Sequence, residues 1–273
     1  MKPEPVTADR PLRLIRALAW RTRTEGVRYL FIPVAMFAAV ITLAIVTSLT
    51  GTGHINGAKA LAAFAERYGA HADAVTVGIG LLLGPGLVAL FSCMSVAQLV
   101  RNLIGAEASR GGIEALLAAP YRPGTIMTAL LGYVGAVATL YWVGMSAIAA
   151  LALAAVTWST GATVSLTASY LLAALIVPLL ASWAATGLAL LANLLYPQLA
   201  QAGSYGINTG GAGMAGLPAM LPGLGVLFVF LFWASSVSAG ELLGVAGGTV
   251  AAVAVTGVAT IARRFRPDAV LES

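Results

Sequence analysis

Six apolar stretches dominate this chain and limit what it can fold into. A helix needs about 20 apolar residues to cross the roughly 30 Å hydrocarbon core of a bilayer. The stretches at 29–49, 75–100, 126–156, 166–195, 217–237 and 242–262 all reach that length. The sequence therefore predicts an all-α membrane protein with six transmembrane helices.

The shortage of charge supports the same class. Charged residues make up 9% of the 273 residues and hydrophobic residues 59%, whereas a soluble domain carries about 25% charged residues. The net charge of +5 comes from bases that lie beside apolar runs. We therefore expect anionic lipid headgroups, and no nucleic acid, as the partner of these bases.

The positions of the basic residues predict the orientation of the six spans. Thirteen of the 15 bases lie in the tail at 1–28, in the loop after the second apolar run, or in the tail at 263–273. Only Lys59 and Arg67 fall on the opposite side. Because basic residues concentrate in cytoplasmic segments, we expect both termini in the cytoplasm and the chain in the cell (inner or plasma) membrane.

The N-terminal segment has the pattern of an amphipathic helix lying on the membrane. At 11–24, apolar residues recur on one side of a helical wheel and arginines on the other. The residues assigned to this interfacial helix are Arg13, Arg16, Trp20 and Arg23. It is either a membrane anchor or a lever that joins the first span to a cytoplasmic partner. A second short helix is expected outside the membrane, near 58–68.

Several kinds of chemistry have no visible carriers in the sequence. A phosphate-binding loop needs a lysine after its glycines, and neither Lys2 nor Lys59 follows such a loop. A GxGxxG match at 211–216 follows a membrane helix, so we interpret it as compositional. Every Asp, Glu and His lies in a loop, in a tail or near a helix end, which leaves a proton or sodium relay without carriers. We expect no catalytic residue, metal site or cofactor on this chain.

Glycines and prolines punctuate the apolar runs. Pro85 interrupts the second run and Pro178 the fourth, and each removes a helix hydrogen bond. Glycines four residues apart occur in the last run, at Gly240, Gly244 and Gly248. This spacing allows close helix approach. We expect it to serve packing within the chain, with a dimer seam as the alternative.

A polar island at 101–122 separates the second and third runs. The part at 107–120 can form a short helix, with Glu107, Arg110 and Glu114 on one side and apolar residues on another. Pro120 ends it. A helix this short is marginal alone in water. It therefore needs a docking surface, or it is simply a surface helix that joins two spans.

The island resembles the signature of the ATP-binding-cassette type-2 permeases, a family of exporters. The family pattern is a glutamate, three residues, Gly-Thr, an aliphatic residue, a glutamate, any residue, Leu-Leu, any residue, a small hydroxyl residue and a proline. The matching positions are Glu107, Gly111, Ile113, Glu114, Leu116, Leu117 and Pro120. Gly112 stands in place of the usual threonine, and Ala119 in place of the small hydroxyl residue.

This resemblance implies a partner and a role for the island. In the family, the segment is a coupling helix that sits in a groove of a separate ATPase subunit, and two permease chains pair with two ATPases. Mg-ATP is then bound by the partner ATPase. By analogy Glu107, Arg110 and Glu114 contact the ATPase, and Leu116 and Leu117 pack on the bundle. The coupling set is Glu107, Arg110, Gly111, Ile113, Glu114, Leu117 and Pro120.

The resemblance also places a transport path between two permease chains, along the first, second and fifth spans. Candidate path residues are Thr42, Thr47, Met94, Phe228 and Phe232. A path without charges favours an amphipathic cargo, such as a drug, an antibiotic or a lipid. A polysaccharide exporter, a lipid-modifying enzyme and a non-transporting membrane protein stay open as alternatives. A homodimer and a heterodimer are equally compatible with the sequence.

Overall fold

The computed structural model describes residues 11–25, 27–50, 58–109, 123–195, 216–233 and 238–264, and no strand occurs in these ranges. The helices, in chain order, are α1 (Pro11–Glu25), α2 (Val27–Leu49), α3 (Ala58–Glu66), α4 (Ala74–Ser109), α6 (Pro123–Thr160), α7 (Ala168–Leu195), α9 (Leu217–Phe228), η2 (Val229–Trp233), α10 (Ala239–Leu242), η3 (Leu243–Gly247) and α11 (Gly248–Arg264). The elements η2 and η3 are single π-helical segments. The all-helical fold class is confirmed for the described residues.

Five helices are long and apolar enough to cross a membrane: Phe31–Leu49, Ala74–Leu103, Gly124–Thr160, Ala168–Asn193 and Gly240–Gly257. They correspond to five of the six apolar runs. The fifth run forms a shorter apolar helix, Leu217–Phe232. The chain is therefore a multi-pass helical membrane protein, and a sixth span stays a prediction.

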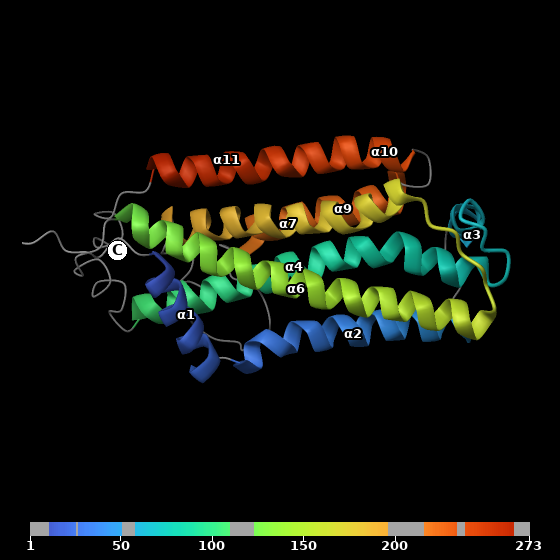
Figure 1. Cartoon of the computed structure of the whole chain (residues 1–273), viewed down its shortest axis with the longest axis horizontal. Coiled ribbons are helices and arrows are strands. Elements are labelled where there is room, and N and C mark those ends of the chain that lie inside the picture. The colour runs from blue at the N-terminus through green and yellow to red at the C-terminus, as the bar shows by residue number, and fades with distance from the viewer. Residues whose placement is uncertain are drawn as a thin grey trace, which may run out of the picture.

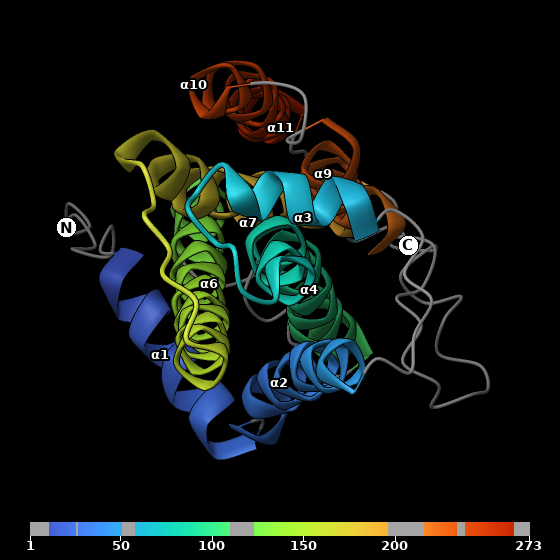
Figure 2. The ribbon, with the colours of Figure 1, turned by 90° about the vertical axis from the view of Figure 1, so that its right-hand side faces the viewer.

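Helix α4 is the centre of the bundle. Helices α2, α6, α7 and α9 surround it, and α3 lies across one of its ends (Figures 1 and 2). Helix α11 packs on α7, away from α4. Of the five long helices, α4 is the most buried and α2 the least buried.

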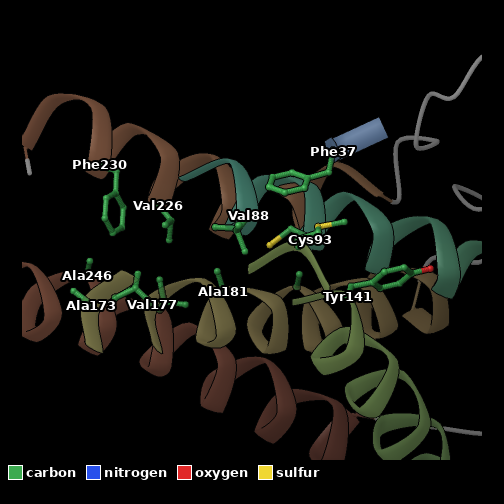
Figure 3. Close-up of a cluster of buried hydrophobic side chains, with 14 of the residues drawn as sticks. Phe37, Val88, Cys93, Tyr141, Ala173, Val177, Ala181, Val226, Phe230 and Ala246 are labelled. Carbon is green, nitrogen blue, oxygen red and sulfur yellow. The ribbon is translucent and has the colours of Figure 1, made fainter. Parts of the chain in front are cut away.

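Small residues let the central helices approach closely. A Cβ atom on Gly223 of α9 would lie 2.8 Å from the Ala89 carbonyl oxygen of α4, and one on Gly86 of α4 would lie 2.7 Å from Leu227. Figure 3 shows Val226 and Phe230 pointing toward α7. Both side chains are buried. Glycine is therefore required where α4 and α9 cross.

The three glycines of the last run do not pack closely against any other part of the chain that the structure describes. A Cβ atom on Gly240, Gly244 or Gly248 would meet no atom of the described residues within 4 Å. Gly247 and Gly257 face α7 instead. Gly244 lies within the π-helical segment η3, whose wider turn changes which residues face a neighbouring helix.

Candidate functional site

One end of the bundle gathers the elements expected to meet a partner. Helix α1, the end of α4, the start of α6 and the end of α11 all lie at this end, on the left in Figure 1. Helix α3 lies at the opposite end. We call these the inner end and the outer end. The exposed Arg13 and Arg16 lie at the inner end, and Lys59 and Arg67 at the outer end.

The helices that flank the expected coupling segment end and begin at the inner end. Helix α4 continues to Ser109 rather than stopping near residue 100, so Glu107 belongs to its last turn. Helix α6 then starts at Pro123. The other coupling residues lie outside the described residues: Arg110, Gly111, Ile113, Glu114, Leu117 and Pro120.

The expected interfacial helix is present as α1, and it packs mainly on α6 rather than on α2. Ile15 and Leu18 face the protein. A Cβ atom on Gly132 of α6 would lie 3.1 Å from the end of the Ile15 side chain. Arg13, Arg16 and Trp20 are exposed. Of Arg23, only its place in the helix is described.

A stripe of half-buried residues runs along α4 and includes the candidate path residue Met94. Its members recur every three or four residues and therefore share one face of the helix. They are Leu83, Leu87, Leu90, Met94, Gln98 and Arg101. The stripe is apolar over its outer part and polar toward the inner end.

This stripe lies between α2 and α9. On one side of it, Phe91 packs edge-on against Phe37 of α2, with ring centroids 5.7 Å apart. On the other side, Gly86 and Cys93 meet α9 at Leu227 and Gly223. Figure 2 shows α4 between these two helices. The expected path helices, the first, second and fifth, are thus neighbours in the fold.

Thr42 and Thr47 are exposed on α2, but they do not share a face. Residues five apart on a helix are separated by about four tenths of a turn. The Thr42 hydroxyl donates to the Ala38 carbonyl at 2.7 Å, and the Thr47 hydroxyl donates to the Leu43 carbonyl at 2.9 Å. Each hydroxyl thus finds its hydrogen-bond acceptor within its own helix, as is common in membranes.

Phe228 and Phe232 lie on an exposed apolar stripe of α9 and η2. Their rings stack with centroids 5.9 Å apart. Phe228 is 56% exposed and Phe232 74% exposed. The stripe also contains Leu217, Leu221 and Leu224. This surface offers flat aromatic and aliphatic groups, which suit lipid, an apolar cargo or another helix.

The sequence reading overlooked a polar seam between α4 and α7. The Ser92 and Ser182 hydroxyls lie 2.7 Å apart and are buried. Thr186 and Asn193 follow on the same face of α7, also buried. The Asn193 amide donates to the Ala189 carbonyl at 2.8 Å, and its oxygen has no partner among the described residues.

The outer end holds a second group of contacts that the sequence reading missed. The Tyr170 hydroxyl of α7 donates to the Leu81 carbonyl of α4 at 2.6 Å. The rings of Tyr68 and Tyr170 lie 5.0 Å apart. Burial raises the pKa of Tyr68, against the lowering effects of Arg67 and of a hydrogen bond with Thr167.

The start of the last span carries a capping box that could have been read from the sequence. The Ser238 hydroxyl accepts a hydrogen bond of 3.3 Å from the Glu241 backbone amide. The Glu241 carboxylate accepts one of 3.0 Å from the Ser238 backbone amide. The S-x-x-E spacing is the usual signal for this arrangement. Glu241 therefore has a structural partner at a helix start.

The polar side chains of the described residues are mostly engaged in helix packing. No three His, Cys, Asp or Glu side chains within the described ranges lie close enough together to hold a metal ion. The buried hydroxyls of Ser92, Ser95, Ser182 and Thr186 donate to helix carbonyls, and those of Ser92 and Ser182 also meet each other. This arrangement stabilises the packing of the helices against one another.

The fold and these surfaces define a class: a multi-pass helical membrane protein in which α1, the end of α4, the start of α6 and the end of α11 lie at one end of the bundle. No family model matches the chain, and no curated protein or solved structure matches it either. The class therefore rests on the sequence and the structure alone.

Proposed function

We propose that this chain is the membrane-spanning permease subunit of an ATP-driven exporter of the cassette type-2 kind. In this proposal it crosses the cell membrane six times with both termini in the cytoplasm. It is not an enzyme, and a separate ATPase subunit binds Mg-ATP and supplies the force. The signature at Glu107–Pro120 carries the proposal.

The helices on either side of this signature support the proposal. The signature starts at Glu107 in the last turn of α4, which ends at Ser109, and α6 begins at Pro123, both at the inner end. Helix α1 packs on the first turns of the same α6, through Ile15 and Gly132. A force applied to the segment would therefore reach the central helix α4 and, through α6, the interfacial helix.

The exposed surfaces of α2, α4 and α9 support the pairing of two permease chains. Helix α2 is largely exposed and apolar. The stripe of α4 that contains Met94 lies beside it, and Phe228 and Phe232 are exposed on the other flanking helix. A second permease chain, identical or different, would cover these surfaces and enclose a path for an amphipathic cargo.

A polysaccharide cargo is the second candidate. The stacked pair Phe228 and Phe232 favours it, because flat aromatic faces suit the apolar faces of sugar rings. A path for sugars would offer a whole row of aromatic residues, and this pair alone does not form such a row. An amphipathic small molecule or lipid therefore remains the first choice.

Reconstitution tests the proposal. Proteoliposomes that contain the chain and its cassette ATPase should move a fluorescent amphipathic compound in an ATP-dependent manner. Proteoliposomes with the chain alone should not. Cargo movement by the chain alone, or ATP-independent movement in the complex, would overturn the proposal. A fluorescent oligosaccharide in parallel vesicles distinguishes the two cargo classes.

A further inference from the structure

A proline in the central helix creates a gap in the hydrogen bonding of α4. Pro85 has no amide hydrogen, so it cannot donate to the carbonyl of Leu81, four residues earlier. In a membrane, a carbonyl freed in this way must find a donor elsewhere in the protein. Gly84 and Gly86 flank the proline, so the helix is weakest here.

The missing donor comes from α7. The Tyr170 hydroxyl donates to the Leu81 carbonyl at 2.6 Å, in a buried setting. The position is specific, because the Leu81 carbonyl is the one that would have accepted a hydrogen bond from an amide at residue 85.

The same tyrosine also holds the outer helix α3. Its ring lies 5.0 Å from the ring of Tyr68 and 6.3 Å from that of Phe64. The backbone carbonyl of Tyr68 accepts a hydrogen bond of 2.7 Å from the amide of Ser165, in the segment that leads into α7. A Cβ atom on Gly78 of α4 would overlap the Leu61 backbone of α3. The backbones of α3 and of the outer half of α4 are therefore in direct contact at Gly78.

The inner half of α4 is held by another neighbour. Gly86 meets Leu227 of α9, and Gly223 of α9 lies over Ala89 and Cys93. The Gly84-Pro85-Gly86 sequence thus separates an outer half, tied to α3 and to the outer end of α7, from an inner half, tied to α9 and, through Ser92, to Ser182 of α7.

We propose that the Tyr170 hydroxyl is a latch across this hinge. It replaces the hydrogen bond that Pro85 removes, and so joins α3, the outer half of α4 and the outer end of α7 into one body. This body swings at Gly84–Gly86 only when the bond from Tyr170 to Leu81 breaks. The latch goes beyond the proposed transport function and does not rest on it, because it is a property of this chain alone.

Hydrogen exchange of the full chain in lipid nanodiscs tests the latch. Tyr170→Phe removes the donor and should speed amide exchange at residues 81–89 by about threefold to about twentyfold, the range set by interhelical hydrogen bonds in membranes. Tyr68→Phe is the matched control. It removes a hydroxyl from the same aromatic cluster but leaves the Leu81 carbonyl satisfied, so exchange there should stay within about twofold.

A second background isolates the role of the proline. In Pro85→Ala, residue 85 regains its amide hydrogen and can donate to Leu81 itself. Tyr170→Phe should then change exchange at 81–89 by less than about twofold. An equal acceleration in both backgrounds, or none in the native background, would overturn the latch. If Tyr170→Phe alone fails to accumulate, accumulation of the double variant supports the latch and its failure contradicts it.

The single cysteine reports whether the effect is local. Cys93 is fully buried in the inner half of α4, beneath Gly223. In Tyr170→Phe it should stay as unreactive toward maleimide as in the native chain, while amide exchange at 81–89 rises. If Cys93 labelling rises by the same factor as the exchange, Tyr170 only stabilises the fold as a whole, and the latch is wrong.

Discussion

The two ends of this bundle are built in different ways. At the outer end, residues far apart in the sequence are tied by hydrogen bonds and by backbone contact: Tyr170 to Leu81, Ser165 to Tyr68, and Gly78 to Leu61. At the inner end, α1 rests on α6 through the flexible end of Ile15. The outer end therefore resists small changes in shape, and the inner end can adapt to them.

This difference suits a protein that receives force at one end. A surface that must accept a moving partner has to yield locally, whereas the far end has to respond as a unit. In the proposed exporter, the inner end meets the ATPase and the outer end releases cargo. This contrast between the two ends can be tested by substitutions at each of them.

The first prediction concerns the backbone contact at the outer end. Gly78→Ala should destabilise the chain by about 1–3 kcal/mol, because an added Cβ atom meets the Leu61 backbone, which cannot move aside. The unfolding midpoint in detergent measures this. Gly144→Ala is the control, because its Cβ atom would meet nothing within 4 Å among the described residues. A Gly78→Ala chain as stable as the control would show that the outer end is not rigid.

The second prediction concerns the seam between the two ends. Ser92→Ala should cost about 0.6 kcal/mol, and at most about 1.7 kcal/mol, because the hydroxyl pair with Ser182 is an interhelical hydrogen bond in an apolar interior. A double-mutant cycle with Ser182→Ala measures the pairwise part. Additive effects of the two substitutions would mean that each serine acts only through its own helix carbonyl.

The third prediction concerns the glycine contact at the inner end. Gly132→Ala should change stability by less than about 0.5 kcal/mol, because the new methyl group meets only the end of the Ile15 side chain, and the gain in helix propensity offsets the crowding. The unfolding midpoint, compared directly with Gly78→Ala, measures the contrast. A loss as large as that of Gly78→Ala would remove the distinction between the ends.

The smallest effect is a dependence on pH at the outer end. Because the pKa of Tyr68 is raised above 10.0 in the folded chain, the neutral phenol is favoured by folding. The contribution of this phenol to the free energy of unfolding is complete below pH 10 and is lost as the pH rises through the pKa of Tyr68 in the folded chain. The unfolding midpoint should therefore be insensitive to this group between about pH 6 and pH 9. Above pH 10, Tyr68→Phe should lose less stability than the native chain, and identical curves would contradict this.

Much of the fold could be predicted from the sequence, because length and apolar periodicity determine where membrane helices form. The amphipathic helix expected at 11–24 is α1, and the short outer helix expected near 58–68 is α3. Helix α4 extends beyond residue 100 because helix-forming residues such as Leu103, Ala106 and Glu107 follow its apolar run.

The missed features depend on contacts between distant residues. No periodicity reveals that Tyr170 reaches Leu81, since the match follows from how α4 and α7 lie side by side. Gly244 meets no close neighbour among the described residues, and the π-helical segment in which it lies could not be read from the sequence. The coupling residues from Arg110 to Pro120 lie outside the described residues, so their role remains a prediction.

The central claim is that a separate ATPase drives this chain through the segment between α4 and α6. Co-purification with the cassette ATPase tests it most directly, with Glu114→Arg compared against Glu66→Arg, a charge reversal on the exposed surface of α3. We predict that the ATPase accompanies the native chain and Glu66→Arg, and is lost from Glu114→Arg. An ATPase that stays bound to Glu114→Arg, with ATP-driven transport intact, would contradict the claim.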